Sequence, residues 1–230
     1  MRRKDGKVEI NLKERYDPAY YGGVINKFFP WAPELWAKSV ANIIGKNGLF
    51  KILDVGCGPG QVTLALAKEL RQRNVNVRIT GVDILDRSLK IARENAINYN
   101  VESIVDFRIG DAVNLPFGNN EFDIIMASLL FPFLNEKEAI KFFNETYRVL
   151  KTGGKFYFIH PNRLRINWLV GYFVTRDTRD YELSFVEHSY NKQETKELID
   201  KSSLANGKID VKNKWLGLLV ETTGRINKNL

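Results

Sequence analysis

The feature that most constrains this chain is a short apolar segment that runs directly into a loop with alternating glycines. Residues 52–55 have the composition of a buried strand. The glycines follow at every second position, as Gly56, Gly58 and Gly60. Because glycine lacks a Cβ atom, such a loop can turn sharply, adopt positive φ and let a ligand rest against the backbone. Residues 61–73 then show helical apolar spacing, and this order predicts a site for a nucleoside ligand.

The glycine spacing separates this loop from two other nucleotide-binding loops. The dinucleotide fingerprint G-x-G-x-x-G needs a glycine or alanine where Gln61 stands. A phosphate-binding P-loop ends in Gly-Lys-Ser or Gly-Lys-Thr, and the sequence lacks that ending here. An NAD-dependent oxidoreductase is therefore a weak alternative. The simpler alternative is that the glycines only form a tight turn between the strand and the helix and bind no ligand.

Acidic residues mark the ends of three successive predicted strands. Asp54 lies near the end of 51–55, and Asp83 closes 77–83. Asp111 follows 105–109. A carboxylate at the tip of the second strand is placed to accept hydrogen bonds from both ribose hydroxyls. A single aspartate at a strand end is usually a helix cap, but the repetition favours a ligand site.

The rest of the chain continues the alternation of strands and helices. Further strands are predicted near 122–127 and 155–159, and helices at 86–98 and 135–150. Asn135 with Glu138, and Asn191 with Glu194, have the spacing of capping boxes at helix starts, and Gly153 is expected to close the 135–150 helix. The alternation predicts a parallel sheet with ligands at the carboxyl ends of its strands. The last two strands, about 208–215 and 218–224, are closely connected and must pair antiparallel.

With these residues in view, the chain resembles the class I S-adenosylmethionine-dependent methyltransferases, and in particular the branch that includes quinone-biosynthesis and other small-molecule enzymes. The resemblance covers roughly residues 35–160. Six ordered motifs carry it, at 53–60, 81–83, 110–112, 115–117, 122–125 and 148–154. It implies an α/β fold with a Rossmann-like, doubly wound, seven-stranded sheet. That sheet is mostly parallel with an antiparallel C-terminal strand, and an N-terminal cap and a lid insertion accompany it.

The resemblance also implies S-adenosyl-L-methionine as the cofactor and S-adenosyl-L-homocysteine as its product. The loop would hold the methionine end of the cofactor through Asp54, Gly56, Cys57, Gly58 and Gly60. Asp83 would bind the ribose hydroxyls, Ile84 would pack on the adenine, and Asp111 and Ala112 would meet its edge. Ser128 would lie near the transferred methyl group.

The expected organisation is a single methyltransferase domain over 1–230. An N-terminal arm and cap (1–45) precede the cofactor-binding core (46–160), a candidate substrate lid (161–190) follows, and the last helix and strand pair (191–230) end the chain. The aromatic residues of the cap and the lid, and the apolar run after the fourth strand, suggest the acceptor site. Candidate acceptor-binding residues are Tyr20, Tyr21, Phe131, Trp168 and Tyr172. Packing in the core is the alternative for each of these aromatic segments.

Methyl transfer is an in-line displacement, so it depends mainly on positioning the acceptor. An acceptor that starts protonated also needs a base. His160 follows the fifth strand and is the candidate catalytic base, ahead of Tyr20 and Tyr21, although a histidine at a strand end is more often structural. The run after the fourth strand is not the Asn/Asp-Pro-Pro-Tyr/Phe of enzymes that methylate base amines, so a small apolar or aromatic metabolite is the favoured acceptor.

Composition narrows the partners further. The net charge of +8 favours anionic partners in general, so an RNA or protein methyltransferase is the main alternative, and a noncatalytic cofactor-binding protein is the other. Cys57 is the only cysteine, so a cysteine zinc site is excluded and no metal is expected. The longest apolar stretch, 124–134, is too short to span a bilayer, and residues 1–5 lack signal-peptide character. A cytoplasmic enzyme is therefore expected, and its oligomeric state is not predicted.

Overall fold

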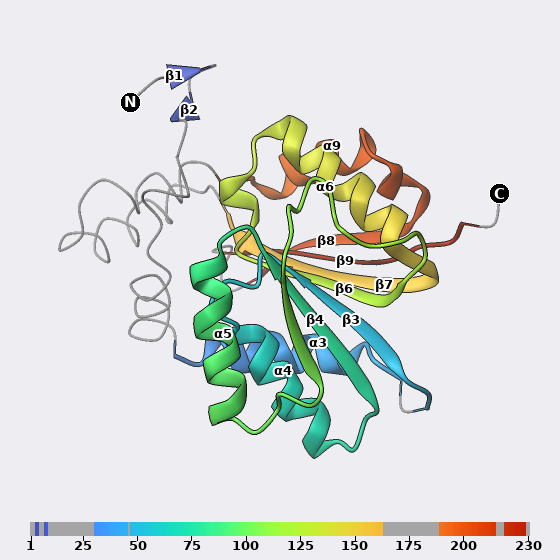
Figure 1. The fold of residues 1–230 in the computed structure, drawn as a ribbon. Helices are drawn as coiled ribbons and strands as arrows, with labels where there is room; N and C mark the ends of the chain where they lie inside the picture. The colour runs from blue at the N-terminus through green and yellow to red at the C-terminus, as the bar shows by residue number, and fades with distance from the viewer. Residues whose placement is uncertain are drawn as a thin grey trace.

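A seven-stranded sheet forms the centre of the molecule (Figure 1). The computed structural model describes residues 3–4, 7–8, 30–45, 47–162, 189–214 and 219–228. The strands of the sheet are β3 (Phe50–Val55), β4 (Val77–Asp83), β5 (Val105–Ile109), β6 (Phe122–Ser128), β7 (Leu150–Pro161), β8 (Lys208–Lys214) and β9 (Leu219–Arg225). A separate antiparallel pair joins β1 (Arg3–Lys4) and β2 (Lys7–Val8).

The strand order is β5-β4-β3-β6-β7-β9-β8. Strands β3 to β7 are parallel, and β9 runs antiparallel to both β7 and β8. The chain builds outward from β3 in one direction through β4 and β5, and then returns to place β6 on the other side of β3. In sheets of this type, ligands bind at that switch point, outside the carboxyl ends of the strands.

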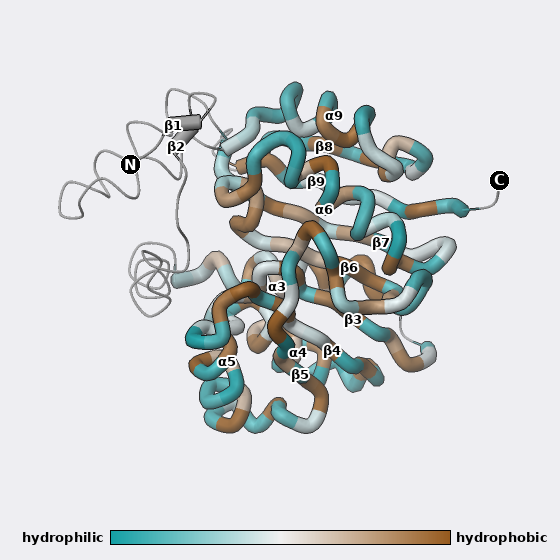
Figure 2. Tube along the Cα trace, turned by 45° about the horizontal axis from the view of Figure 1, so that its top comes forward, coloured by the Kyte–Doolittle hydropathy of each residue, from teal (hydrophilic) through white to brown (hydrophobic). Residues whose placement is uncertain are grey.

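Helices cover both faces of the sheet (Figure 1). One face packs against α3 (Ala32–Asn42), α4 (Gln61–Gln72) and α5 (Asp86–Asn98), and the other against α6 (Glu136–Val149), α9 (Lys192–Asp200) and the short helices η1 (Phe131–Phe133) and η2 (Ser203–Asn206). Figure 2 shows hydrophobic and hydrophilic colours alternating along α5 and α9, as expected for helices that bury one side. The two faces thus have separate hydrophobic cores.

Alternate side chains of β7 pack into the two different cores. Tyr157 and Ile159 belong to the core beneath α3, α4 and α5. Phe156 and Phe158 belong to the core beneath α6 and α9. Because successive side chains on a strand point to opposite faces, a continuously apolar strand is the signature of a sheet covered on both sides.

The predicted architecture is confirmed, with a Rossmann-like sheet whose one antiparallel strand is β9. Both capping boxes are present: Asn135 accepts from Glu138 N at 3.0 Å, and Asn191 accepts from Glu194 N at 3.0 Å. The prediction that Gly153 closes α6 is wrong. The helix ends at Val149; Leu150 is already extended (φ −77°, ψ 137°), and β7 begins there instead of near residue 155. Most of the candidate lid, residues 163–188, lies outside the described residues.

None of the helices in the described ranges is long and apolar enough to cross a membrane. The longest of them, α6, has 14 residues and a markedly amphipathic pattern. Its polar side is solvated while Phe142 and Phe143 are buried against the sheet.

Replacing Asn135 with alanine should destabilise the fold by about 1 kcal/mol, because the first turn of α6 then loses the side-chain acceptor for its backbone N–H groups. Urea denaturation of the parent and the variant measures the difference. Asn98→Ala is the control, since Asn98 is an exposed residue at the end of α5. Equal losses in the two variants would contradict the capping role.

Candidate functional site

A cavity of about 230 Å³ lies at the carboxyl ends of β3, β4, β5 and β6. The loop after each of these strands contributes to its lining, and α3, α4 and α6 add side chains at the rim. The lining residues from the four loops are Gly56, Cys57, Gly58, Pro59, Asp83, Ile84, Leu85, Gly110, Asp111, Ala112, Val113, Ser128, Leu129, Leu130, Phe133 and Leu134. Those from the helices are Pro33, Trp36, Gln61, Val62 and Glu138. The cavity is thus at the switch point of the sheet.

Most of the residues predicted to bind a cofactor line this one cavity. They are Gly56, Cys57, Gly58, Asp83, Ile84, Asp111, Ala112 and Ser128. Asp54 and Gly60 are not part of the lining and lie behind the loop. Gly60 has a φ of 83° and directly precedes α4, so it shapes the turn from loop to helix. Their expected contact with a ligand therefore remains a prediction.

The glycine loop is held by backbone hydrogen bonds to the end of β4. Gly56 N and Cys57 N both donate to Val82 O, at 2.8 and 3.0 Å. Gly56 has a φ of 72°, and a Cβ atom on it would lie 2.9 Å from Leu130 Cδ1. Because that distance is shorter than a normal carbon contact, a side chain at this position would displace the cavity wall. The loop therefore needs glycine here mainly for its conformation.

Asp83 ties two of the cavity loops together. Its Oδ2 accepts from Gly58 N at 2.9 Å, and its Oδ1 accepts from Leu85 N at 2.9 Å. Burial raises the pKa of the Asp83 carboxyl, while these N–H donors oppose the rise. Each carboxylate oxygen has two acceptor positions, so Asp83 can still accept hydrogen bonds from a ligand in the cavity.

Asp54 is a buried carboxyl with one unused oxygen. Its Oδ2 accepts from Thr63 Oγ1 at 2.5 Å, whereas its Oδ1 is buried with no hydrogen-bond partner among the described residues. Burial raises its pKa to about 7; the Thr63 hydrogen bond opposes this, and the charge of Asp83 adds to it. An unpartnered buried carboxylate oxygen is costly, so this side of the loop favours a cationic or hydrogen-donating ligand.

His160 does not reach the cavity in the part of the chain described. Its ring is fully buried, with Nδ1 3.0 Å from Pro161 O and Nε2 3.3 Å from Thr195 Oγ1. It stacks on Phe131 at a centroid distance of 4.6 Å. Burial lowers its pKa to about 4, so the imidazole is neutral at pH 7. This position gives a structural role to His160 and no support to the predicted base.

Phe131 is likewise a core residue, contrary to its prediction as part of the acceptor site. Its side chain is completely buried and packs edge-on against Phe142 at 5.7 Å. The apolar wall of the cavity is instead formed by Leu129, Leu130, Phe133 and Leu134. The other predicted acceptor-binding residues, Tyr20, Tyr21, Trp168 and Tyr172, lie outside the described residues.

Among the lining residues that were not predicted as site residues, three come from the helices α3 and α6. Pro33 and Trp36 come from α3, and Glu138 comes from the capping box of α6. Glu138 Oε2 accepts from Asn135 N at 2.8 Å, so the cap fixes its carboxylate beside the cavity. The sequence could have indicated Glu138, because the helix that contains it begins directly after the apolar run that follows the fourth strand.

Comparison with known proteins shows what this chain is similar to. Residues 52–154 match the model of a methyltransferase domain. The ubiquinone/menaquinone biosynthesis C-methyltransferase UbiE of Rickettsia felis is 34% identical over 122 residues, which is 53% of this chain and 48% of that protein. The enzyme of the same name from Rickettsia akari is 33% identical with the same coverage. The chain thus spans about half the length of the curated relatives that it matches.

Solved structures agree on the fold. A putative S-adenosyl-L-methionine-dependent methyltransferase of Methanococcus maripaludis superposes with a TM-score of 0.73 at 21% identity, covering 97% of this chain and 99% of that one. The plantazolicin methyltransferase BpumL, solved in complex with S-adenosylhomocysteine, gives a TM-score of 0.71 at 16% identity, covering 91% and 90%. At these identities the likeness concerns the fold.

Residues 52–154 are thus similar to a methyltransferase domain, and the fold is similar to that of solved S-adenosylmethionine-dependent methyltransferases. The curated relatives are named as C-methyltransferases of ubiquinone and menaquinone biosynthesis.

The raised pKa of Asp54 predicts a pH dependence of stability. Between pH about 4 and about 7 the folded chain holds a proton on Asp54 that the unfolded chain has released. The contribution of this group to the free energy of unfolding therefore falls as the pH rises through this window, by about 1.4 kcal/mol per pH unit at most, and is constant above it. Asp54→Asn should gain stability relative to the parent over the same window.

Chemical denaturation at a series of pH values tests this. The control is Asp86→Asn, which changes a half-exposed carboxylate on α5 and should keep the slope of the parent. If Asp54→Asn and the parent have parallel stability curves from pH 4 to 7, the buried carboxyl does not titrate as described.

Proposed function

We propose that this chain transfers the methyl group of S-adenosyl-L-methionine to a small apolar or aromatic metabolite and releases S-adenosyl-L-homocysteine. The observation that carries the proposal is the convergence of Gly56, Asp83 and Asp111 on one cavity at the switch point of the sheet. The UbiE relatives, whose names describe C-methylation in quinone biosynthesis, favour a quinone-related ring as the acceptor and a ring carbon as the attacked atom.

The residues present fit the cofactor chemically. A sulfonium with an amino group is cationic, and two carboxyl groups near the loop, the buried Asp54 and the half-buried Asp83, have remaining acceptor capacity. Asp83 is at the tip of β4, where a carboxylate can accept from both ribose hydroxyls. Ile84 is 42% exposed beside it, an unusual exposure for isoleucine that a flat adenine ring would reduce. Asp111 and Ala112 are placed to meet the edge of that ring.

The bound cofactor would supply an electrophilic methyl group, and the chain's own residues would position the acceptor and exclude water. Leu129 adopts a φ of 59°, which is rare for a leucine, and this conformation turns the chain after β6 so that the apolar wall closes one side of the cavity. An acceptor held against Leu130 and Phe133 would be desolvated, which favours attack by an anionic carbon or oxygen. No histidine lines the cavity within the described part, so we propose an acceptor that reacts as its anion.

The acceptor side also depends on segments outside the described residues. We propose that the N-terminal segment 1–45 and the segment 161–190 cover the acceptor, as cap and lid of a single domain. The apolar wall and the exposed Trp31 directly before α3 support this arrangement. We also propose that the enzyme works in the cytoplasm, where its cofactor would be available.

Asp83→Ala should weaken binding of S-adenosylhomocysteine about 30-fold, because a charged acceptor and the anchor of Gly58 N are lost together. Titration calorimetry with purified protein measures the affinity. The matched control is Asp86→Ala, three residues further along, whose carboxylate pairs with Lys90 and does not line the cavity. No heat with either the cofactor or its product in the parent, or equal affinity in Asp83→Ala and the parent, would overturn the proposed function.

The acceptor class is tested by incubating the enzyme with methyl-labelled cofactor and a panel of quinone-related aromatic compounds, with RNA and protein added in parallel reactions. We expect label in the small-molecule fraction, with the new bond to a ring carbon when the product is analysed by mass spectrometry and NMR. Label in RNA or protein alone would contradict the small-molecule acceptor while leaving methyl transfer intact.

A further inference from the structure

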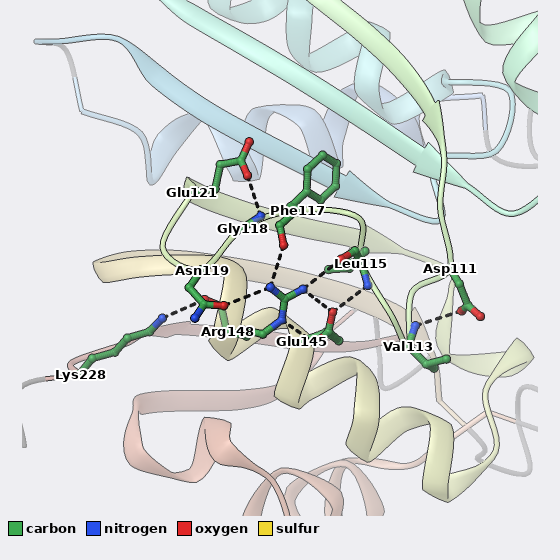
Figure 3. A network of polar contacts seen from close by, with 10 residues as sticks. All are labelled: Asp111, Val113, Leu115, Phe117, Gly118, Asn119, Glu121, Glu145, Arg148 and Lys228. Atoms are coloured by element: carbon green, nitrogen blue, oxygen red, sulfur yellow. Dashed lines mark hydrogen bonds and ion pairs between the residues drawn. The ribbon is translucent and has the colours of Figure 1, made fainter.

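Two of the motifs that mark this family lie away from the cavity and have no role in the site described so far. They are the Leu-Pro-Phe run at 115–117 and the segment that begins at Arg148. In the structure these two motifs contact each other (Figure 3). Residues 110–113, which line the cavity, lie just before the first of them on the same loop.

Arg148 uses all five of its N–H donors in this contact (Figure 3). Nη2 donates to Leu115 O at 3.0 Å, and Nη1 donates to Phe117 O at 2.7 Å. Nη1 also donates to Asn119 Oδ1 at 3.1 Å. Nε and Nη2 form a bidentate pair with Glu145, each at 2.7 Å. The planar guanidinium therefore binds the loop at three residues and is itself held in place by the carboxylate of Glu145.

Glu145 completes the contact from the same helix. Its Oε2 accepts from Leu115 N at 2.7 Å, so the N–H and the C=O of Leu115 are both bound by side chains of α6. The hydrogen bonds with Arg148 lower the pKa of Glu145, which keeps it ionised. Beyond the loop, Asn120 N and Glu121 N donate to the carbonyls of Arg148 and Val149, at 3.0 and 2.8 Å.

The cavity end of this loop is held at its start by one backbone hydrogen bond to β4, from Gly110 N to Asp83 O at 3.1 Å. Among the described residues, its regular pairing is limited to a single bridge between Asp111 and Asn114. Asp111 Oδ1 accepts from Val113 N at 3.0 Å, which is a bond within the same turn. Ala112 and Val113 also pack against the core beneath α6. On the side that follows the turn, the anchor is the pair Arg148 and Glu145, which binds Leu115.

We propose that Arg148 is a positioning residue for the adenine end of the cavity: through Leu115 and Phe117 it fixes the loop that presents Asp111 and Ala112. The inference rests on the proposed function, since it assigns that end of the cavity to adenine. Arg148 does not line the cavity, so it acts only through the loop. The alternative is that Arg148 contributes to overall stability alone.

Arg148→Ala should weaken binding of S-adenosylhomocysteine about tenfold. It should also reduce the preference for this compound over S-inosylhomocysteine, in which an oxygen replaces the adenine amino group that faces Asp111. The kcat at saturating cofactor should stay within twofold of the parent, because the reacting methyl lies at the other end of the cavity. Titration calorimetry and steady-state kinetics measure these three quantities.

The matched control is Arg73→Ala. Arg73 also pairs with a glutamate on its own helix, Glu69 at 2.7 Å, and with a side chain beyond it, Asn42 at 3.0 Å, but it touches no loop of the cavity. Arg148→Lys keeps the charge without the five-donor geometry and should give an intermediate affinity. Glu145→Gln keeps an acceptor for Leu115 N and should bind nearly as the parent does.

Hydrogen exchange of the backbone amides of residues 110–121, measured without ligand, separates this proposal from the proposed function. Exchange at Leu115 should be faster in Arg148→Ala than in the parent and unchanged in Arg73→Ala. If Arg148→Ala lowers the melting temperature but leaves exchange, affinity and the adenine preference unchanged, the positioning role is overturned. If the parent itself binds no S-adenosylhomocysteine, the proposed function fails, and the adenine assignment fails with it.

Should Arg148→Ala not fold, Glu145→Ala and Arg148→Lys carry the test: Glu145→Ala should show the same loss of affinity and adenine preference, and Arg148→Lys an intermediate loss. Parent-like values in both of these variants would overturn the proposal.

Discussion

The hydrogen bonds between the glycine loop and the end of β4 determine the shape of the whole site. Val82 O accepts from Gly56 N and Cys57 N, and Asp83 accepts from Gly58 N. These contacts exist because β3 and β4 are paired in register, with Asp54 beside Gly81 and Val55 beside Val82. The loop therefore leaves β3 at the height where β4 ends. A slip of this pairing by one residue would reverse which side chains face the core and remove the anchor of the loop.

The same arrangement places two carboxyl groups where their ionised form is costly. Asp54 is buried and Asp83 is half-buried near the loop, and this desolvation raises the pKa of each carboxyl. Asp54 has an opposing hydrogen bond from one hydroxyl, and Asp83 has only backbone N–H groups. A fold without a ligand would be more stable with neutral residues here. A cationic ligand lowers this cost, so the carboxylates favour such a ligand over a neutral nucleoside of similar shape.

The architecture and much of the cavity could be predicted from the sequence because local signals determine them. Glycine spacing, helix caps and strand ends depend on a few neighbouring residues, and they led to Gly56, Asp83 and Asp111, which do line one cavity. The wrong predictions concern the face of the strand or helix on which a side chain lies. Residues 156–159 are apolar at every position, so no alternation indicates which face His160 joins. Its parity with Phe158 places it beneath α6, away from the cavity. Phe131 could not be distinguished from Phe133 for the same reason, since a short helix rotates one inward and the other toward the cavity.

The two ends of α6 belong to different parts of the site, and this gives the helix a role beyond covering the sheet. At its start, Glu138 lines the cavity beside the apolar wall. At its end, Arg148 donates hydrogen bonds to the loop that follows β5. A helix of 14 residues is about 21 Å long and does not bend easily. Packing by Phe142 and Phe143 fixes it on the strands, so the position of the wall and the position of the loop are set by one rigid element. A fold that must hold two reactants in line gains from such a connection, because an independent shift of either side would misalign them.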